Sequence, residues 1–105
     1  MAVRVGIPGI EPSRHEAVYE VCARHGVRQL TVFGSRARGQ AHSSSDLDLL
    51  VEFADGRDPD LFELGALQQD LSEAAGVDVD LKTRDMFSPH GLTHALRSAV
   101  VAYAA

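Results

Sequence analysis

The chain has 105 residues, 45% of them hydrophobic and 24% charged, which suits one soluble compact domain spanning residues 1–105. Its formal charge of −5 argues against a protein that holds long nucleic acid by neutralising phosphates. No apolar stretch has the length of a membrane span, no signal-peptide pattern is present, and the single cysteine cannot form an internal disulfide. These features predict a cytoplasmic protein with no membrane partner.

The first half of the chain predicts one helix and two strands. Apolar residues recur at helical spacing over residues 12–25, where a glycine follows. Residues 27–33 are rich in β-branched side chains, and residues 46–53 alternate apolar and polar positions, so both segments are expected to be strands. The polar segment 39–45 between them suits a loop over a ligand, with only a short helical turn near Arg36.

The second half repeats these patterns. Four leucines at helical spacing predict a second helix over residues 60–75, and alternation over 77–82 predicts a third strand. Residues 88–98 resemble a last helix, and residues 100–103 a short last strand. The expected fold class is α/β (α+β), a small mixed sheet with helices packed on one face and a site on the other.

A Gly-Ser turn follows the first predicted strand and suits a phosphate group. Gly34 lets the backbone approach a ligand closely, and Ser35 can donate a hydroxyl hydrogen bond. Arg36 and Arg38 add planar guanidinium groups that match phosphate geometry. Alone, this pattern is a weak signal, because such turns are common. It gains weight from the acidic pair that comes next in the chain.

Asp46 and Asp48 lie two residues apart in a strand pattern, so both carboxylates should leave the same face, about 6.6 Å apart along the chain. Hard oxygen ligands on one rigid strand suit Mg²⁺, which fills its other positions with water and substrate phosphates. Asp78 and Asp80 repeat the spacing on a later strand, and with Glu52 these acids would repel on one uncompensated face. The alternative is a solvent-facing strand edge whose charges prevent aggregation.

Together, these motifs resemble the signature of the DNA polymerase beta-type nucleotidyltransferases, and most closely that of the minimal nucleotidyltransferases (MNT). The resemblance covers roughly residues 15–103. The matching segments are Gly34-Ser35, Arg38-Gly39, Ser45-Asp46-Leu47-Asp48-Leu49 and Val79-Asp80-Leu81.

The resemblance implies a role for each matching residue. Asp46 and Asp48 would hold two Mg²⁺ ions, and Asp80 would hold the catalytic ion and activate the acceptor. Ser35 and Arg38 would contact the β and γ phosphates of ATP, and Gly34 and Arg36 complete the nucleotide-binding set. Asp78 departs from relatives that carry a basic residue at its position, and is expected to act behind Asp80 rather than on the metal.

Prokaryotic MNT proteins commonly accompany a HEPN-domain protein. The resemblance therefore implies an antitoxin of a type VII-like toxin–antitoxin pair, which transfers AMP from ATP to a tyrosine hydroxyl of the HEPN toxin and can form a hetero-oligomer with it. Two alternatives stay open. The acceptor could be a small molecule or an RNA end, or the chain could inhibit a toxin by binding alone.

The remaining candidate ligands carry less weight. His90 and His94 form the one i, i+4 pair among five histidines, without a cysteine or third acid at zinc-site spacing, so surface or capping roles are expected. His42 lies in the loop over the expected site, where it could touch phosphate or base. Cys22, on the first helix, is expected to be a small buried apolar side chain.

Overall fold

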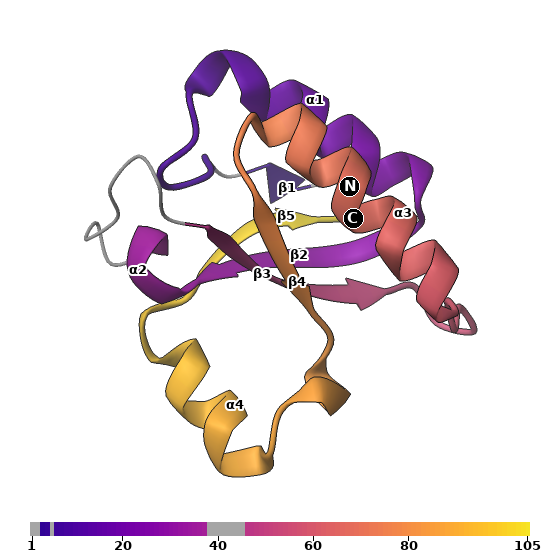
Figure 1. Ribbon diagram of the computed structural model, residues 1–105, viewed down its shortest axis with the longest axis vertical. Coiled ribbons are helices and arrows are strands. Elements are labelled where there is room, and N and C mark those ends of the chain that lie inside the picture. The colour runs from indigo at the N-terminus through magenta and orange to yellow at the C-terminus, as the bar shows by residue number, and fades with distance from the viewer. Residues whose placement is uncertain (1–2, 5, 38–45) are drawn as a thin grey trace.

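A computed structural model describes residues 3–4, 6–37 and 46–105, and within these ranges it leaves out the side chains at positions 3, 4, 35 and 36 (Figure 1). Arg38, His42 and the predicted loop 39–45 therefore lie outside the described residues.

The centre of the protein is a five-stranded mixed sheet with the strand order β1-β5-β2-β3-β4. The pairs β1–β5, β5–β2 and β2–β3 are antiparallel, whereas β3 and β4 run parallel. The strands are β1 (Val3–Arg4), β2 (Val27–Phe33), β3 (Leu47–Phe53), β4 (Val79–Lys82) and β5 (Val100–Ala104).

Two long helices, α1 (Pro12–Arg24) and α3 (Leu61–Ala75), lie side by side over one face of the sheet (Figure 1). The short helix α4 (Pro89–Ala95) lies on the opposite side, with no fully buried residue. None of the described helices is long and apolar enough to cross a membrane. The shorter helices are α2 (Gly34–Ala37), η1 (Arg84–Met86), α4 (Pro89–Ala95) and η2 (Leu96–Ser98).

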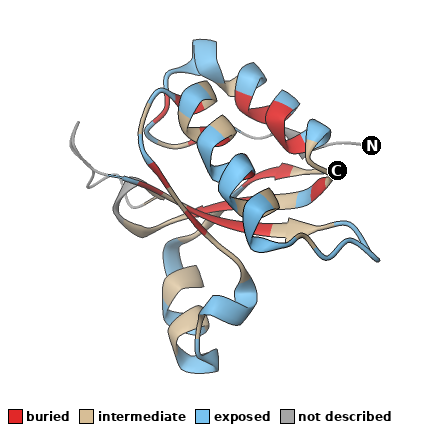
Figure 2. Cartoon of the chain, turned by 45° about the vertical axis from the view of Figure 1, so that its right-hand side comes forward, coloured by how far each residue is buried: buried red, intermediate tan, exposed pale blue. Residues whose placement is uncertain are grey.

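The core fills the space between the sheet and the two long helices. The inward side chains of β2 and β3 are almost fully buried, and the inner faces of α1 and α3 cover them (Figure 2). Burial of this apolar surface is what holds the layers together. Its members with no more than 2% exposure include Val18, Cys22, Leu30, Val32, Leu47, Leu49, Val51, Leu67 and Leu71. Cys22 is 0% exposed, which confirms the prediction made for it.

The expected fold class is confirmed, and the predicted elements are present with small changes at their ends. The last predicted helix divides into α4 and η2, and β4 begins at Val79 rather than at residue 77. Two short elements were not predicted, β1 and η1. A two-residue strand carries no periodic pattern, and β1 exists only through its pairing with β5.

Candidate active site

The site forms where β2, β3 and β4 lie next to one another. Asp48 on β3 and Asp80 on β4 are direct partners in the parallel register, although they are far apart in the sequence. Neighbouring strands are about 4.8 Å apart, so the two carboxylate-bearing residues are adjacent. Asp46 is exposed and directly precedes β3. The sheet thus sets one acid of each predicted pair side by side.

Gly34 brings the end of β2 against the same carboxylate. Phe33, the last residue of β2, is the register partner of Asp48, and Gly34 follows it with a φ of 77°. A Cβ atom at position 34 would overlap Oδ2 of Asp48 and would lie 3.1 Å from its Cγ. Only glycine has both the backbone freedom and the space that this approach requires.

The other predicted phosphate ligands are placed only in part. Ser35 and Arg36 lie in α2, directly after Gly34, so their backbone starts next to Asp48. Their side chains, and the whole of Arg38, lie outside the described residues. The roles assigned to Ser35, Arg36 and Arg38 therefore stay predictions.

Lys82, a basic residue that the sequence did not assign to the site, forms an ion pair with Asp80, the proposed catalytic carboxylate. Nζ of Lys82 donates to Oδ1 of Asp80 at 2.8 Å, and both side chains are partly exposed. The signal was available, because Lys82 is two residues after Asp80 and must share its strand face.

A second ion pair corrects the expectation of an uncompensated acidic face. Arg84 in η1 pairs with Glu52 on β3, just as Lys82 pairs with Asp80. Repulsion among the acids is thus partly relieved by the chain's own cations. The expectation of a divalent ion therefore depends on how the carboxylates are placed relative to one another, and not on how many acids share this face of the sheet.

The donor set at this position suits Mg²⁺. Asp46, Asp48 and Asp80 offer hard carboxylate oxygens, and the bound ammonium of Lys82 marks Oδ1 of Asp80 as a place where a cation is favourable. Within residues 6–37 and 46–105, no three histidine, cysteine or acidic side chains converge as a ready metal site. The fit to the ion therefore rests on the oxygen chemistry of the three aspartates and on the adjacent pair Asp48 and Asp80, because one or two carboxylates are what Mg²⁺ usually takes from a protein.

The histidines lie away from these acids or outside the described residues. His15 contacts the carbonyl oxygen of Ile10 at 2.8 Å, and His25 contacts Asp70 at 2.8 Å. His90 and His94 are exposed on α4.

Comparison with known proteins gives the family. The profile of the nucleotidyltransferase domain matches residues 15–102. A Methanocaldococcus jannaschii protein named as a candidate protein adenylyltransferase is 36% identical over 72 residues, which cover 69% of this chain and 75% of that protein. The protein adenylyltransferase MntA of Thermococcus cleftensis is 42% identical over 62 residues, covering 59% of this chain and 61% of MntA.

Solved structures agree with the sequence relatives. One, described as a candidate minimal nucleotidyltransferase, has a TM-score of 0.69 at 43% identity and covers 84% of this chain and 88% of that chain. A toxin–antitoxin crystal structure with AMP-PNP has the same TM-score at 24% identity, over 86% of this chain and 73% of that chain, and supports the fold alone. Gly34 and Asp80 both lie next to Asp48. The chain belongs to the nucleotidyltransferase domain family and has the fold of its minimal members.

Proposed function

We propose that this chain is a Mg²⁺-dependent protein adenylyltransferase that moves AMP from ATP to a tyrosine hydroxyl of a HEPN-domain toxin. In this role it would be the antitoxin of a type VII-like pair in the cytoplasm. The observation that carries the proposal is the register that sets Asp48 beside Asp80, with the backbone of Gly34 against Asp48.

Each part of the site would have a separate task. The backbone at Gly34 and the side chains of Ser35, Arg36 and Arg38 would bind the phosphates of ATP. Asp46, Asp48 and Asp80 would hold Mg²⁺, with two ions expected. When bound, the metal supplies positive charge that neutralises the triphosphate and orients it.

The transfer is a displacement at the α-phosphorus of ATP. The tyrosine oxygen forms a bond to that phosphorus, while the bond from phosphorus to the oxygen bridging the α and β phosphates breaks and pyrophosphate leaves. The hydroxyl proton passes to the carboxylate of Asp80, which acts as the general base. Asp80 is suited to this task because 43% of its side chain is exposed, so an acceptor can reach it.

A protein acceptor is favoured by the names of the relatives. One is called a protein adenylyltransferase, and the other is a candidate for the same activity. Structures with this fold include MntA–HpeT toxin–antitoxin complexes and an AMPylated HEPN toxin bound to an MNT antitoxin. We extend these partners and this acceptor chemistry to the present chain as part of the proposal.

The test is co-expression with a HEPN-domain toxin, chosen from the genes next to the one for this chain, followed by intact-mass measurement of the toxin. We expect the HEPN protein to gain the mass of AMP with the wild type and with Asp55→Asn, a matched change at a fully exposed carboxylate. Asp48→Asn and Asp80→Asn should abolish the gain.

Other outcomes would contradict the proposal. If Asp48→Asn protects cells from the toxin as well as the wild type does and no AMP is transferred, inhibition by binding alone is the function. If labelled ATP modifies RNA ends or small molecules but not the HEPN protein, the acceptor is of another class.

A further inference from the structure

Lys82 is the only lysine in the chain, whose other nine basic residues are all arginine. It lies at the end of β4, on the strand face that carries Asp80. Its ammonium group donates to Oδ1 of Asp80 at 2.8 Å. The single lysine thus binds the carboxylate of Asp80, to which the proposed function assigns both metal binding and proton transfer.

The choice of lysine affects how firmly Asp80 is held. An arginine can bind a carboxylate through two parallel hydrogen bonds in a fixed geometry, whereas an ammonium group is a point charge on a flexible stem. The Lys82 side chain is 36% exposed and the Asp80 side chain 43%, so water screens the pair and can replace either partner. An ion pair of this kind positions Asp80 and still breaks readily.

A divalent cation and the ammonium of Lys82 would both be attracted to the carboxylate of Asp80. A cation shared between Asp48 and Asp80 would lie close to the positive charge of Lys82, which is bound at Oδ1 of Asp80. Two positive charges so close repel each other, and further negative charge is needed to offset this repulsion. The phosphates of a nucleotide bring that charge.

We propose that Lys82 is the resident counter-ion of Asp80: it positions the carboxylate before substrate binds, and it leaves Oδ1 when a metal–nucleotide complex arrives. This inference rests on the proposed function, because it assumes that Asp80 is a metal ligand. Its consequence is that Lys82 weakens the binding of free divalent metal and thereby favours metal that arrives with nucleotide.

Metal affinity without nucleotide tests the inference directly. Isothermal titration with Mn²⁺ should show tighter binding to Lys82→Met than to the wild type, by about threefold or more, because a competing charge is removed. Lys82→Arg keeps the charge and should bind no more tightly than the wild type. Arg84→Met is the matched control: it removes a cation from the Glu52 ion pair, and the affinity should stay within about twofold of wild type.

A second measurement follows the ammonium itself. Reductive methylation with ¹³C-formaldehyde keeps the positive charge and labels one side chain, Lys82, besides the terminal amine. The Lys82 methyl signal should differ between the wild type and Asp80→Asn, because the substitution removes its ionic partner. In the wild type, Mg²⁺ with a non-hydrolysable ATP analogue should move the signal toward its position in Asp80→Asn.

The two measurements separate failure of this inference from failure of the proposed function. If metal binding depends on Asp80 but Lys82→Met leaves the Mn²⁺ affinity unchanged, Lys82 is no competitor and the inference is wrong while the function stands. If neither metal nor the ATP analogue binds the wild type, the proposed function fails as well. Thermal unfolding of each variant confirms that it is folded.

Discussion

At the scale of single residues, the clearest constraint is the space at Gly34. The chain contains a natural comparison for it in Gly56, which has a φ of 80° against 77° at Gly34. A Cβ atom at Gly56 would meet no described atom within 4 Å, whereas one at Gly34 would overlap the Asp48 carboxylate. Both positions therefore require a residue that tolerates a positive φ. Only position 34 also requires that no Cβ atom be present next to Asp48.

Alanine at each position should separate these requirements. Gly34→Ala and Gly56→Ala should both lower the free energy of unfolding by about 1–2 kcal/mol, the cost of a left-handed backbone for a residue with a Cβ. Only Gly34→Ala should also displace Asp48 and reduce binding of an ATP analogue at least about tenfold. Urea unfolding and calorimetric titration measure the two effects. Equal loss of nucleotide binding in both variants would contradict the assignment of Gly34 to the site.

Cys22 carries a reactive thiol that solvent does not reach. Burial raises the pKa of its thiol to about 12, and the side chain is 0% exposed. Since the thiolate is the reactive form, a thiol reagent at pH 8 should label the native protein more slowly than the urea-unfolded protein by a factor of about 10³ or more. Rapid labelling of native protein would show that α1 opens locally.

At the scale of elements, β4 needs explanation because it is an edge strand of the sheet. Exposed edges invite pairing with other chains. Here α3 occupies the open side: Oγ of Ser72 accepts from the amide of Val79 at 3.1 Å, and Oε1 of Gln68 accepts from the amide of Leu81 at 3.2 Å. The helix thereby fixes the strand that carries Asp80 and covers two of its outward amides.

Removal of one of these acceptors should loosen β4. Gln68→Ala leaves the Leu81 amide without its partner and should cost about 1 kcal/mol, with roughly fivefold faster hydrogen exchange at Leu81. Gln69→Ala is the matched control, because the Gln69 side chain bonds within α3, to Glu73, and to no other residue that the structure describes. Urea unfolding and exchange measured by NMR test the difference. Equal effects of the two substitutions would mean that the bond to β4 contributes nothing.

Periodicity predicted the long elements well because their burial follows a simple pattern. α3 ends before the glycine that the sequence indicates, and β2 spans the predicted residues. Contacts between elements could not be predicted in this way. The bond from Gln68 to Leu81 and the pairing of Arg84 with Glu52 depend on how α3 and η1 meet the sheet, which no local pattern encodes.

For the site, the motif predicted a set of residues, and the structure shows how some of them are placed relative to one another. Asp48 and Asp80 could be named from their spacing and from the family resemblance, and the parallel register then made them partners. The compensating charges come from basic residues that a pattern of acids alone does not include. Lys82 could have been found from alternation alone, whereas Arg84 required the structure.

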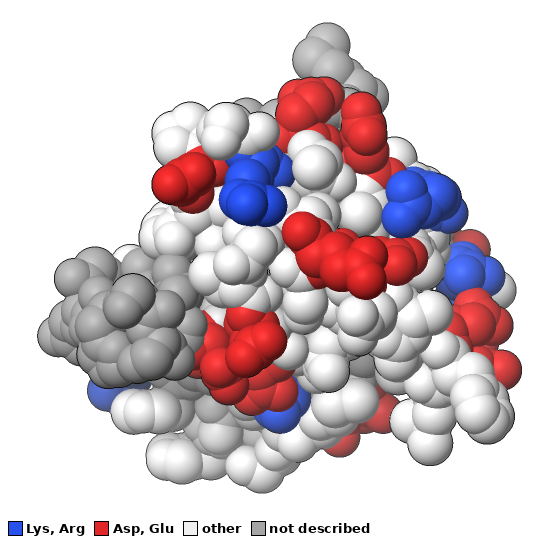
Figure 3. Space-filling model, turned by 45° about the horizontal axis from the view of Figure 1, so that its top comes forward, with Lys and Arg blue, Asp and Glu red and all other residues white. Residues whose placement is uncertain are grey.

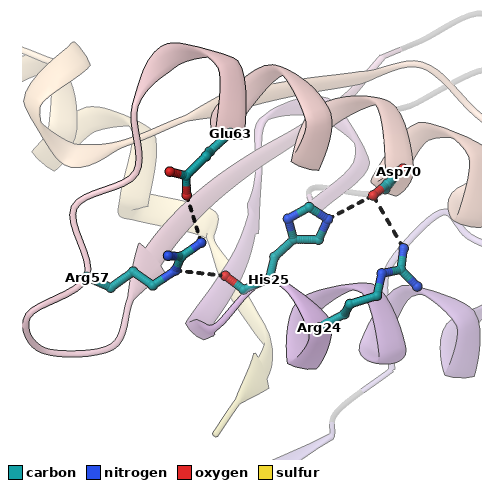
Figure 4. A network of polar contacts seen from close by, with 5 residues as sticks. All are labelled: Arg24, His25, Arg57, Glu63 and Asp70. Carbon is teal, nitrogen blue, oxygen red and sulfur yellow. Dashed lines mark hydrogen bonds and ion pairs between the residues drawn. The ribbon is translucent and has the colours of Figure 1, made fainter.

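At the scale of the whole molecule, a polar network joins the C-terminal end of α1 to α3 (Figure 4). The His25 ring, just after α1, contacts Asp70 on α3 at 2.8 Å, and Arg24 donates to the same carboxylate at 3.3 Å. Arg57 joins the carbonyl oxygen of His25 to Glu63 at the start of α3. This polar network ties together the two helices that cover the sheet. On the face of the molecule that Figure 3 shows, acidic patches alternate with fewer basic ones.

The network predicts how stability depends on pH. The hydrogen bond from His25, and next to it that from Arg24, holds the pKa of Asp70 below its ordinary value of about 3.9. A carboxyl whose pKa is lowered by folding stabilises the protein above its unfolded pKa, and loses that effect as pH falls through the folded value. Asp70→Asn should therefore lower the free energy of unfolding at pH 7, by less than about 1 kcal/mol because solvent screens the pair.

The loss caused by Asp70→Asn should shrink as the pH falls below about 3.9, the ordinary pKa of an aspartate in the unfolded chain, because protons then bind the unfolded state more readily than the folded one. Urea unfolding of both proteins above and below this pH measures the difference. Asp55→Asn, at a side chain that is 100% exposed, controls for the general effect of removing a negative charge. A difference between wild type and Asp70→Asn that stays constant down to pH 3 would show that the contacts of Asp70 do not depend on its charge. The tie between α1 and α3 would then be one of packing, and acid would unfold the protein by another route.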